Sequence, residues 1–228
     1  MSELRVKDSD EIIKVQNVYC VGKNYLDHIK EFVSSDENEE IPDEPVIFLK
    51  PNTAVIPESG IVRTPEFKGK KISNNLQNEV ELVVVIGKDG INIEQENARE
   101  YIYGYAVGID FTLRDIQTEL KTKGLPWTLS KGFLTSAPVS EILKKNELNN
   151  PLNLDMVLKV NKVVSQKANT SQMIFTVDYI VHYISSIFGL RRGDLIFTGT
   201  PAGITKLNSG DEVEAEIEKI GCLNIKVE

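Results

Sequence analysis

Hydrophobic and polar positions along the chain predict a set of short strands. Glu79 to Ile86 (EVELVVVI) is rich in β-branched residues and apolar on both faces after its two glutamates, which indicates a buried strand. Tyr103 to Asp110 (YGYAVGID) predicts a second buried strand, and Pro45 to Lys50 (PVIFLK) a shorter one. Asp155 to Asn161 and Glu212 to Ile217 alternate apolar and polar residues, as half-buried strands do.

Two amphipathic helices and one tight turn are predicted as well. From Leu113, apolar residues recur at i, i+3 and i+7, and Thr112 with Asp115 resembles a capping box. The segment from about Thr176 to Phe188 carries a wider apolar stripe, which is typical of a helix packed on a core. The pair Asn161-Lys162, between LKV and VVS, predicts a hairpin turn.

The order of these elements is mixed and does not follow a βαβ pattern. It favours an α+β fold, rich in strands, with antiparallel and mixed sheets and a few short helices. The chain has 228 residues, 41% of them apolar, which is enough for one domain with its own core. We therefore expect a single domain over residues 1–228, in which residues 1–15 form an N-terminal extension.

The net charge of the chain limits the kinds of binding partner that it can have. The chain has 34 acidic and 26 basic residues, a net charge of −8, and no long basic block. This composition argues against nucleic acid and against an anionic membrane surface as partners. The N-terminus has no signal-peptide pattern, and the longest apolar run, Leu82 to Ile86, is too short to span a bilayer. We expect a cytoplasmic protein.

Glu79 and Glu81 are the first candidates for chemistry. Residues i and i+2 of a strand point to the same face, so the two carboxylates lie close together on an otherwise apolar strand. A bound cation is one way to offset their mutual repulsion. The alternative is a solvent-facing polar edge, although a strand that is apolar on both faces is usually buried.

Asp110 is a third carboxylate, at the end of the second buried strand. Taken alone, it is equally well explained as an acid that caps the following helix. Together with Glu79 and Glu81 it indicates a site for a hard cation, Mg²⁺ or Mn²⁺. Zinc is disfavoured because the chain has only two histidines and no CxxC pair.

The two histidines differ in their surroundings. His182 lies away from the apolar stripe of its predicted helix, so we expect it at the surface. His28 stands in GKNYLDHIKEF with Glu31 three residues later, and on a helix the two side chains share a face. A carboxylate that orients an imidazole suits a general base. A surface ion pair is the other explanation of His28 and Glu31.

Three further features carry less information on their own. Lys131 lies in an apolar stretch and can stabilise a developing oxyanion, or it is an exposed loop lysine. Gln117 and Arg114 follow Asp110 on the predicted helix. Phe197 to Ile204 (FTGTPAGI) offers hydroxyl and backbone N–H groups that can hold a carboxylate, but it lacks the lysine of a P-loop.

Several stretches resemble the fumarylacetoacetate hydrolase family, most closely its small single-domain members of the acylpyruvase and oxaloacetate decarboxylase type. They cover most of the chain in the family's order. The stretches are CVGKNYLDHIKE (20–31), PVIFLKPNTAVI (45–56), EVELVVVIGK (79–88), GYAVGIDFTLRDIQ (104–117), KGLPWTLSKGF (123–133), NTSQMIF (169–175) and GDLIFTGTPAGI (193–204).

The resemblance implies roles for individual residues and a quaternary structure. It implies a homodimer, and a lid around the His28 segment that includes the acidic stretch Val33 to Glu44. The implied roles are metal binding for Glu79, Glu81 and Asp110, catalysis for His28, Glu31 and Lys131, and substrate contact for Lys23, Gln117 and Thr200.

Two departures from the family bear on substrate preference. Many relatives have Arg where this chain has Lys23, and a lysine lacks the bidentate geometry of arginine towards a carboxylate. Many relatives also place one or two histidines just before the metal glutamates, where Gln77 and Asn78 stand here. The metal ligands are unaffected, but proton carriers are lost.

The implied reaction is Mg²⁺-dependent cleavage of a C–C bond in a small 2-oxo acid, through a metal-stabilised enolate. Acylpyruvate hydrolysis would use His28 to activate water, whereas oxaloacetate decarboxylation would need no water. An alternative within the same fold is an isomerase or hydratase of dienoic diacids. An alternative outside enzymes is a metal-dependent dicarboxylate-binding protein, against which the pairing of His28 with Glu31 argues.

Overall fold

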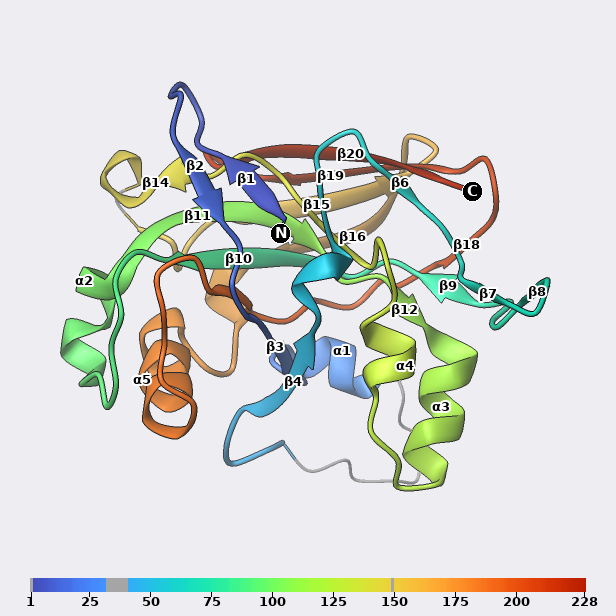
Figure 1. Cartoon of the computed structure of the whole chain (residues 1–228), viewed down its shortest axis with the longest axis horizontal. Coiled ribbons are helices and arrows are strands. Elements are labelled where there is room, and N and C mark those ends of the chain that lie inside the picture. Colours follow the sequence, from blue (N-terminus) through green and yellow to red (C-terminus); the bar gives the residue numbers. More distant parts are fainter. Residues whose placement is uncertain (1, 32–40, 149) are drawn as a thin grey trace.

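Most of the chain is organised around a mixed eight-stranded sheet, shown in Figure 1. The computed structural model describes residues 2–31, 41–148 and 150–228. The neighbouring strands of the sheet run antiparallel except for the pairs β3–β17 and β5–β13. From one edge to the other the strands are β4 (Val46–Lys50), β3 (Val18–Gly22), β17 (Leu195–Phe197), β10 (Val80–Ile86), β11 (Ile102–Ile109), β13 (Ala137–Val139) and β5 (Val55–Pro57), with β14 (Leu143–Lys144) paired to β11.

A five-stranded sheet forms the second layer, and three small sheets complete the β structure. The second sheet consists of β16 (Val163–Asn169), β15 (Asp155–Val160), β19 (Glu212–Ile217), β20 (Gly221–Val227) and β6 (Ile61–Val62). The small sheets are β1 (Glu3–Arg5) with β2 (Ile12–Lys14), β7 (Glu66–Phe67) with β8 (Lys70–Lys71), and β9 (Leu76–Gln77) between β12 (Thr112–Leu113) and β18 (Lys206–Leu207).

The helices of the described chain are short. They are α1 (Leu26–Lys30), α2 (Ala98–Tyr101), α3 (Arg114–Thr122), α4 (Thr128–Lys131) and α5 (Val177–Ile187), with 3-10 turns η1 (Asn52–Ala54), η2 (Gln95–Asn97), η3 (Lys145–Glu147) and η4 (Thr170–Gln172). In Figure 1, α3 and α4 lie at one end of the sheet and α5 at the other. This arrangement is the strand-rich α+β fold that the order of elements predicts.

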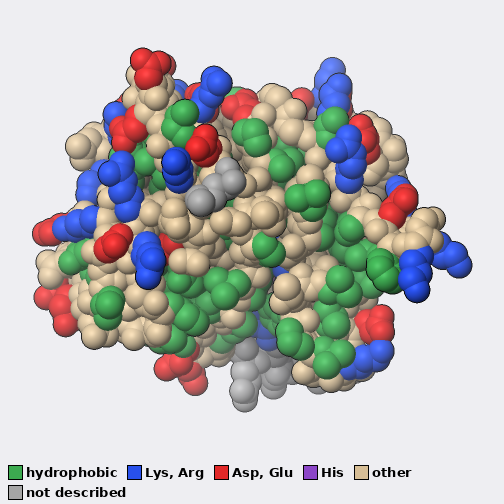
Figure 2. Space-filling view, viewed as in Figure 1, with side chains coloured by type: hydrophobic (Ala, Val, Ile, Leu, Met, Phe, Trp, Pro, Cys, Tyr) green, Lys and Arg blue, Asp and Glu red, His purple; other side chains and the backbone are tan. Residues whose placement is uncertain are grey.

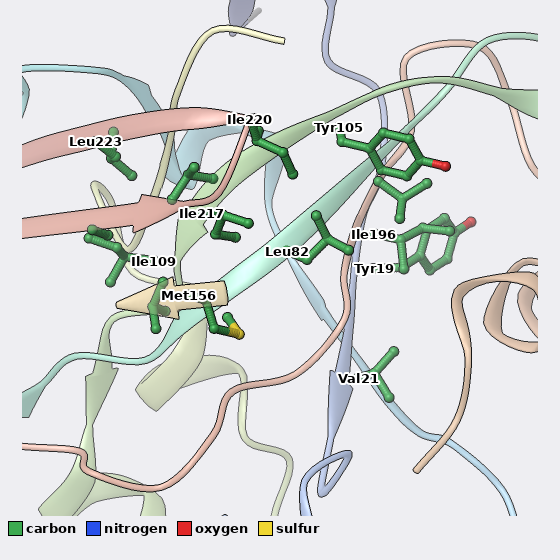
Figure 3. Close-up of a cluster of buried hydrophobic side chains, with 14 of the residues drawn as sticks. Tyr19, Val21, Leu82, Tyr105, Ile109, Met156, Ile196, Ile217, Ile220 and Leu223 are labelled. Atoms are coloured by element: carbon green, nitrogen blue, oxygen red, sulfur yellow. The ribbon is translucent and has the colours of Figure 1, made fainter. Parts of the chain in front are cut away.

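Two hydrophobic clusters bury both faces of β10. Leu82 belongs to the larger cluster, together with Met156 of β15 and Ile217 of β19 in the second sheet (Figure 3). Val83 points the other way and belongs to a smaller cluster with Phe197. The prediction of a strand buried on both faces is therefore confirmed, since every residue of β10 is buried.

Most local predictions are confirmed, and one is wrong. Asn161 and Lys162 form the hairpin turn, both with positive φ (51° and 69°) as a type I′ turn requires. The capping box at Thr112 does not form: Thr112 pairs with Gln77 in a short strand, and the helix begins two residues later. Asp115 instead accepts the backbone N–H of Asn74 over 3.0 Å.

The N-terminal segment, expected as an extension, forms the hairpin β1–β2. Its Leu4 and Ile13 pack in the smaller hydrophobic cluster. Backbone hydrogen bonds also tie it to the sheet, among them Lys7 N–H to the carbonyl of Ile142 over 2.9 Å. The acidic part of the predicted lid, residues 33–40, lies outside the described residues.

The surface shows a mixture of charges. Positive and negative side chains are interspersed over the face shown in Figure 2. Within the described ranges, no helix is long and apolar enough to cross a membrane.

Gly104 provides a test of the packing between β11 and β14. A Cβ atom at Gly104 would lie 2.2 Å from the carbonyl oxygen of Leu143, a backbone atom that cannot rotate away. We expect Gly104→Ala to lower the free energy of unfolding by about 2–3 kcal/mol, as overpacking does. Urea denaturation would measure it. In the matched control, Gly22→Ala, the nearest atom is 3.6 Å away, and equal midpoints for the two variants would contradict the prediction.

Candidate active site

The register of β10 and β11 brings three carboxylates together. Glu81 pairs with Gly108, and the Asp110 N–H donates to the carbonyl of Glu79 over 2.8 Å. Because opposite residues of an antiparallel pair share a face, the side chains of Glu79, Glu81 and Asp110 point the same way. A Cβ atom at Gly108 would lie 2.5 Å from Val83, so only glycine fits opposite Glu81.

The three carboxylates are arranged as a cation site would be. Each of Glu79, Glu81 and Asp110 offers one oxygen, and these oxygens lie within 4.8 Å of one another. All three residues are buried, so a solvent-facing edge does not explain the glutamates. The helix-cap explanation of Asp110 also fails, because α3 begins at Arg114 and has no side-chain cap.

Three basic side chains compensate the buried acids. Lys131 Nζ lies between two of them, 2.6 Å from Glu79 Oε2 and 2.7 Å from Asp110 Oδ2. Lys50 Nζ lies 2.7 Å from Asp110 Oδ1. Arg114 donates through Nη2 to Glu79 Oε1. Removal of any one of these basic partners would leave an uncompensated buried charge.

One oxygen still has capacity for a ligand. Asp110 Oδ1 is buried, and among the described residues it accepts no hydrogen bond of suitable geometry, even though Lys50 Nζ is close to it. An anionic oxygen in that state is a natural ligand for a metal ion. The donor set consists of oxygens alone, which fits a hard divalent cation, and Glu79, Glu81 and Asp110 would hold it.

The electrostatics of the triad point to the same conclusion. Burial and the charges of Asp110 and Glu79 raise the pKa of Glu81 well above its ordinary value. Burial opposes ionisation of Glu79 too, but Lys131 and Arg114 hold its pKa well below its ordinary value. Burial alone would lower the pKa of Lys131, and the carboxylates of Asp110 and Glu79 outweigh it and raise that pKa. A divalent cation supplies the positive charge that Glu81 lacks.

The helix α1 and the turn after β17 hold the predicted dyad. His28 Nδ1 lies 2.9 Å from Glu31 Oε2, and the Gly203 N–H donates to Glu31 Oε1 over 2.7 Å. Burial raises the pKa of Glu31, but its bonds to His28 and Gly203 outweigh burial and lower it below its ordinary value. Glu31 is therefore ionised at neutral pH and fixes the imidazole, which lines the same cavity as the triad.

The residues predicted to contact substrate also line that cavity. Gln117 is buried and accepts a hydrogen bond from Arg114 Nη1. Thr200 Oγ1 accepts a hydrogen bond from Gln166 over 2.8 Å. Lys23 adopts a φ of 59°, in the left-handed region that few non-glycine residues take. The structure thus gathers every predicted site residue around one cavity, with Glu31 directly behind His28.

Sequence reasoning missed several residues of the site. Lys50 gave a weak signal, since it is a charged residue at the end of an apolar run. The sequence pattern assigns no role to Arg114. In the structure its guanidinium donates hydrogen bonds to both Glu79 and Gln117. Lys121 lines the cavity without any sequence signal, whereas Trp127 lies in the stretch 123–133 that resembles the family. His182, expected at the surface, is half-buried because its Nδ1 lies 2.7 Å from the Ile93 carbonyl.

The chain is similar to known proteins over most of its length. Residues 17–228 match the family model described as fumarylacetoacetate (FAA) hydrolase C-terminal. The chain is 44% identical to the mitochondrial oxaloacetate tautomerase FAHD1 of Bos taurus, over 93% of this chain and 92% of that protein. It is 40% identical to the Arabidopsis thaliana protein of the same name, over 92% and 90% of the two chains.

Solved structures of similar proteins superpose on most of this chain. Fumarylpyruvate hydrolase from Pseudomonas aeruginosa, in complex with Mn²⁺ and pyruvate, superposes with a TM-score of 0.91 at 35% identity, covering 99% of this chain and 95% of that one. A 2-hydroxyhepta-2,4-diene-1,7-dioate isomerase from Mycobacterium marinum gives a TM-score of 0.80 at 37% identity, covering 94% and 75%.

Glu81 offers a test of the cation site. We expect Glu81→Gln to melt at or above the wild-type temperature in EDTA, because it removes a carboxylate that its neighbours repel. The same change should weaken Mn²⁺ binding by at least about 100-fold, more than loss of an outer partner does. Scanning fluorimetry with and without Mn²⁺ measures both effects. Glu119→Gln, an exposed change on α3, is the control, and a retained Mn²⁺ shift in Glu81→Gln would contradict the ligand assignment.

Proposed function

The chain belongs to the fumarylacetoacetate hydrolase family of enzymes, and on that premise we propose that it interconverts the enol and keto forms of oxaloacetate with the help of a divalent cation. The observation that carries this proposal is the placement of three buried carboxylates and a His–Glu pair around one cavity. The similarity to oxaloacetate tautomerases over more than nine-tenths of the chain supports the choice of substrate.

Each group has a separate task in the proposed reaction. When bound, the cation supplies Lewis acidity towards the oxygens of a 2-oxo acid. His28, oriented by Glu31, moves a proton at the carbon next to the 2-oxo group. Lys131, which keeps its ammonium form, stabilises negative charge beside the triad. Tautomerisation needs no more than this, because one proton leaves carbon and one joins oxygen.

The charge of the site favours a dicarboxylate. The three acids are matched by three basic side chains, so a divalent cation leaves the filled centre with an excess of positive charge. Lys121 lines the same cavity. Burial and the neighbouring charges of Arg114 and Lys131 lower the pKa of Lys121, so a negative charge bound nearby would stabilise its ammonium form. A dianionic substrate such as oxaloacetate relieves this excess.

Hydrolysis of a C–C bond in an acylpyruvate is a second candidate. The overall similarity to a fumarylpyruvate hydrolase favours it. It uses the same site but needs an attacking water, which His28 would deprotonate. Decarboxylation of oxaloacetate would use the site without that water.

The remaining parts of the proposal come from the sequence and the donor chemistry. We propose Mg²⁺ as the resident cation, with Mn²⁺ able to replace it, because both prefer oxygen ligands. A homodimer and a cytoplasmic location stay predictions. Several similar proteins carry the word mitochondrial in their names.

The proposal predicts metal-dependent turnover of oxaloacetate. Protein loaded with Mg²⁺ or Mn²⁺ should accelerate loss of the enol absorbance of oxaloacetate, and EDTA should abolish the acceleration. Acetylpyruvate and a dienoic hydroxymuconate-type diacid serve as parallel substrates. Cleavage of acetylpyruvate without oxaloacetate tautomerisation would favour the second candidate. If EDTA affects none of the three reactions, both candidates are wrong.

The proton-transfer role predicts the effect of changing His28. We expect His28→Asn to lower kcat for tautomerisation by about 100- to 10,000-fold, the usual contribution of a positioned general base. The affinity for Mn²⁺ should stay unchanged, because His28 is not among the carboxylate ligands. His182→Asn, on α5, is the matched control. Retention of most of kcat in His28→Asn would assign the proton transfer to another group.

A further inference from the structure

A buried amide joins the metal strand to the turn that carries Thr200. Gln166 of β16 is 0% exposed. Its Oε1 accepts hydrogen bonds from the Val80 N–H and from Asn78 Nδ2, each over 3.0 Å. Its Nε2 donates to Thr200 Oγ1 and to the Pro201 carbonyl, each over 2.8 Å.

Backbone groups fix the orientation of this amide. The N–H of Val80 is always a donor and the carbonyl of Pro201 is always an acceptor. A flipped Gln166 amide would place two donors together at Val80 and two acceptors together at Pro201, with no water between them in a fully buried position. The nitrogen of Gln166 therefore faces Thr200, independently of how the amide atoms are assigned.

This orientation determines the polarity of the Thr200 hydroxyl. A hydroxyl has a single proton, and here its oxygen already accepts the bond from Gln166 Nε2. The proton of Thr200 must then point away from Gln166, and Thr200 lines the active-site cavity. We propose that Gln166 is a positioning residue that fixes Thr200 as a hydrogen-bond donor towards an anionic oxygen of the substrate.

The same amide sets the distance between Thr200 and the metal ligands. Val80 stands between Glu79 and Glu81, so the bond from its N–H holds Gln166 against the strand that carries both carboxylates. The Gly199 N–H also donates to Glu81 Oε2, over 2.6 Å. If a cation is bound by Glu79 and Glu81, an anion on it would lie on the side of the cavity that Thr200 lines. This inference rests on the proposed function in one respect, since it takes the ligand to be a 2-oxo carboxylate.

Gln166→Glu reverses the direction of the hydrogen bond between position 166 and Thr200, with little change in side-chain shape. The new carboxylate has no donor for Thr200, which then turns its proton towards position 166 and away from the ligand. We expect pyruvate to bind the Mn²⁺-loaded variant about 10- to 100-fold more weakly, the range for one hydrogen bond to a charged group. Water-proton relaxation by Mn²⁺ measures the dissociation constant. For oxaloacetate, KM should rise more than kcat falls.

A double-mutant cycle separates the effect of Gln166→Glu on the Thr200 hydroxyl from the effect of the added negative charge. In a Thr200→Val background, Gln166→Glu should change pyruvate binding by less than about twofold, because the donor it controls is gone. Thr200→Ser should restore the full effect of Gln166→Glu. Gln95→Glu, at an exposed position, controls for net charge. If Gln166→Glu does not fold, as judged by its thermal melt, Gln166→Met replaces it in the same cycle.

The outcomes distinguish this inference from the proposed function. Equal weakening by Gln166→Glu in both backgrounds overturns the positioning role, and so does absence of pyruvate binding to the Mn²⁺-loaded wild type. A coupled cycle without oxaloacetate turnover supports the positioning role and overturns the proposed substrate. Turnover of oxaloacetate with an additive cycle supports the function and overturns the role of Gln166.

Discussion

Repulsion among three buried carboxylates is the constraint on which the rest of the structure depends. Glu79, Glu81 and Asp110 are forced together by the register of one antiparallel pair. Two like charges 4 Å apart repel by on the order of 4 kcal/mol even at an effective dielectric constant of 20. That is comparable to the total stability of many domains, at about 5–15 kcal/mol. The fold therefore has to bring compensating charge to this one point.

Compensation comes from distant parts of the chain. Lys50 is supplied by the edge strand β4, Arg114 by α3 and Lys131 by α4. The ion pairs compensate Glu79 and Asp110 better than Glu81. The basic partners of Glu79 lower its pKa, whereas burial and the neighbouring acids raise the pKa of Glu81. The unequal balance explains why the centre is both stable and able to accept a further cation.

The turn after β17 then connects the three carboxylates with the pair His28 and Glu31. Its Gly199 N–H binds Glu81, its Thr200 faces the cavity, and its Gly203 N–H binds Glu31. One short segment thus fixes Glu81, Thr200 and Glu31 relative to one another. Glycine at position 199 is required, because its φ of 99° is strained for other residues.

Periodicity was enough to predict the parts of the site that follow from local geometry. Glu79 and Glu81 could be placed on one face because a strand has a period of two, and His28 and Glu31 because a helix brings i and i+3 together. Residues that meet only through tertiary contacts show no periodic pattern in the sequence. Gln166 acts on Val80, 86 positions away in the chain, and nothing in its own segment indicates this. The capping box at Thr112 failed for the same reason, since tertiary pairing with Gln77 overrode a local preference.

The two reactions proposed for this site differ in their need for water. Tautomerisation and hydrolysis share the cation site and the His–Glu pair, and only hydrolysis needs a water beside His28. Phe48 and Trp127 form an aromatic pair in the cavity wall, with ring centroids 5.8 Å apart, and Lys131 Nζ lies 5.2 Å from the Phe48 ring. Both rings are half-buried, so they cover one side of a cavity that is otherwise lined mostly by charged and polar side chains. In the proposed tautomerisation, this aromatic pair would line the space in which the proton moves.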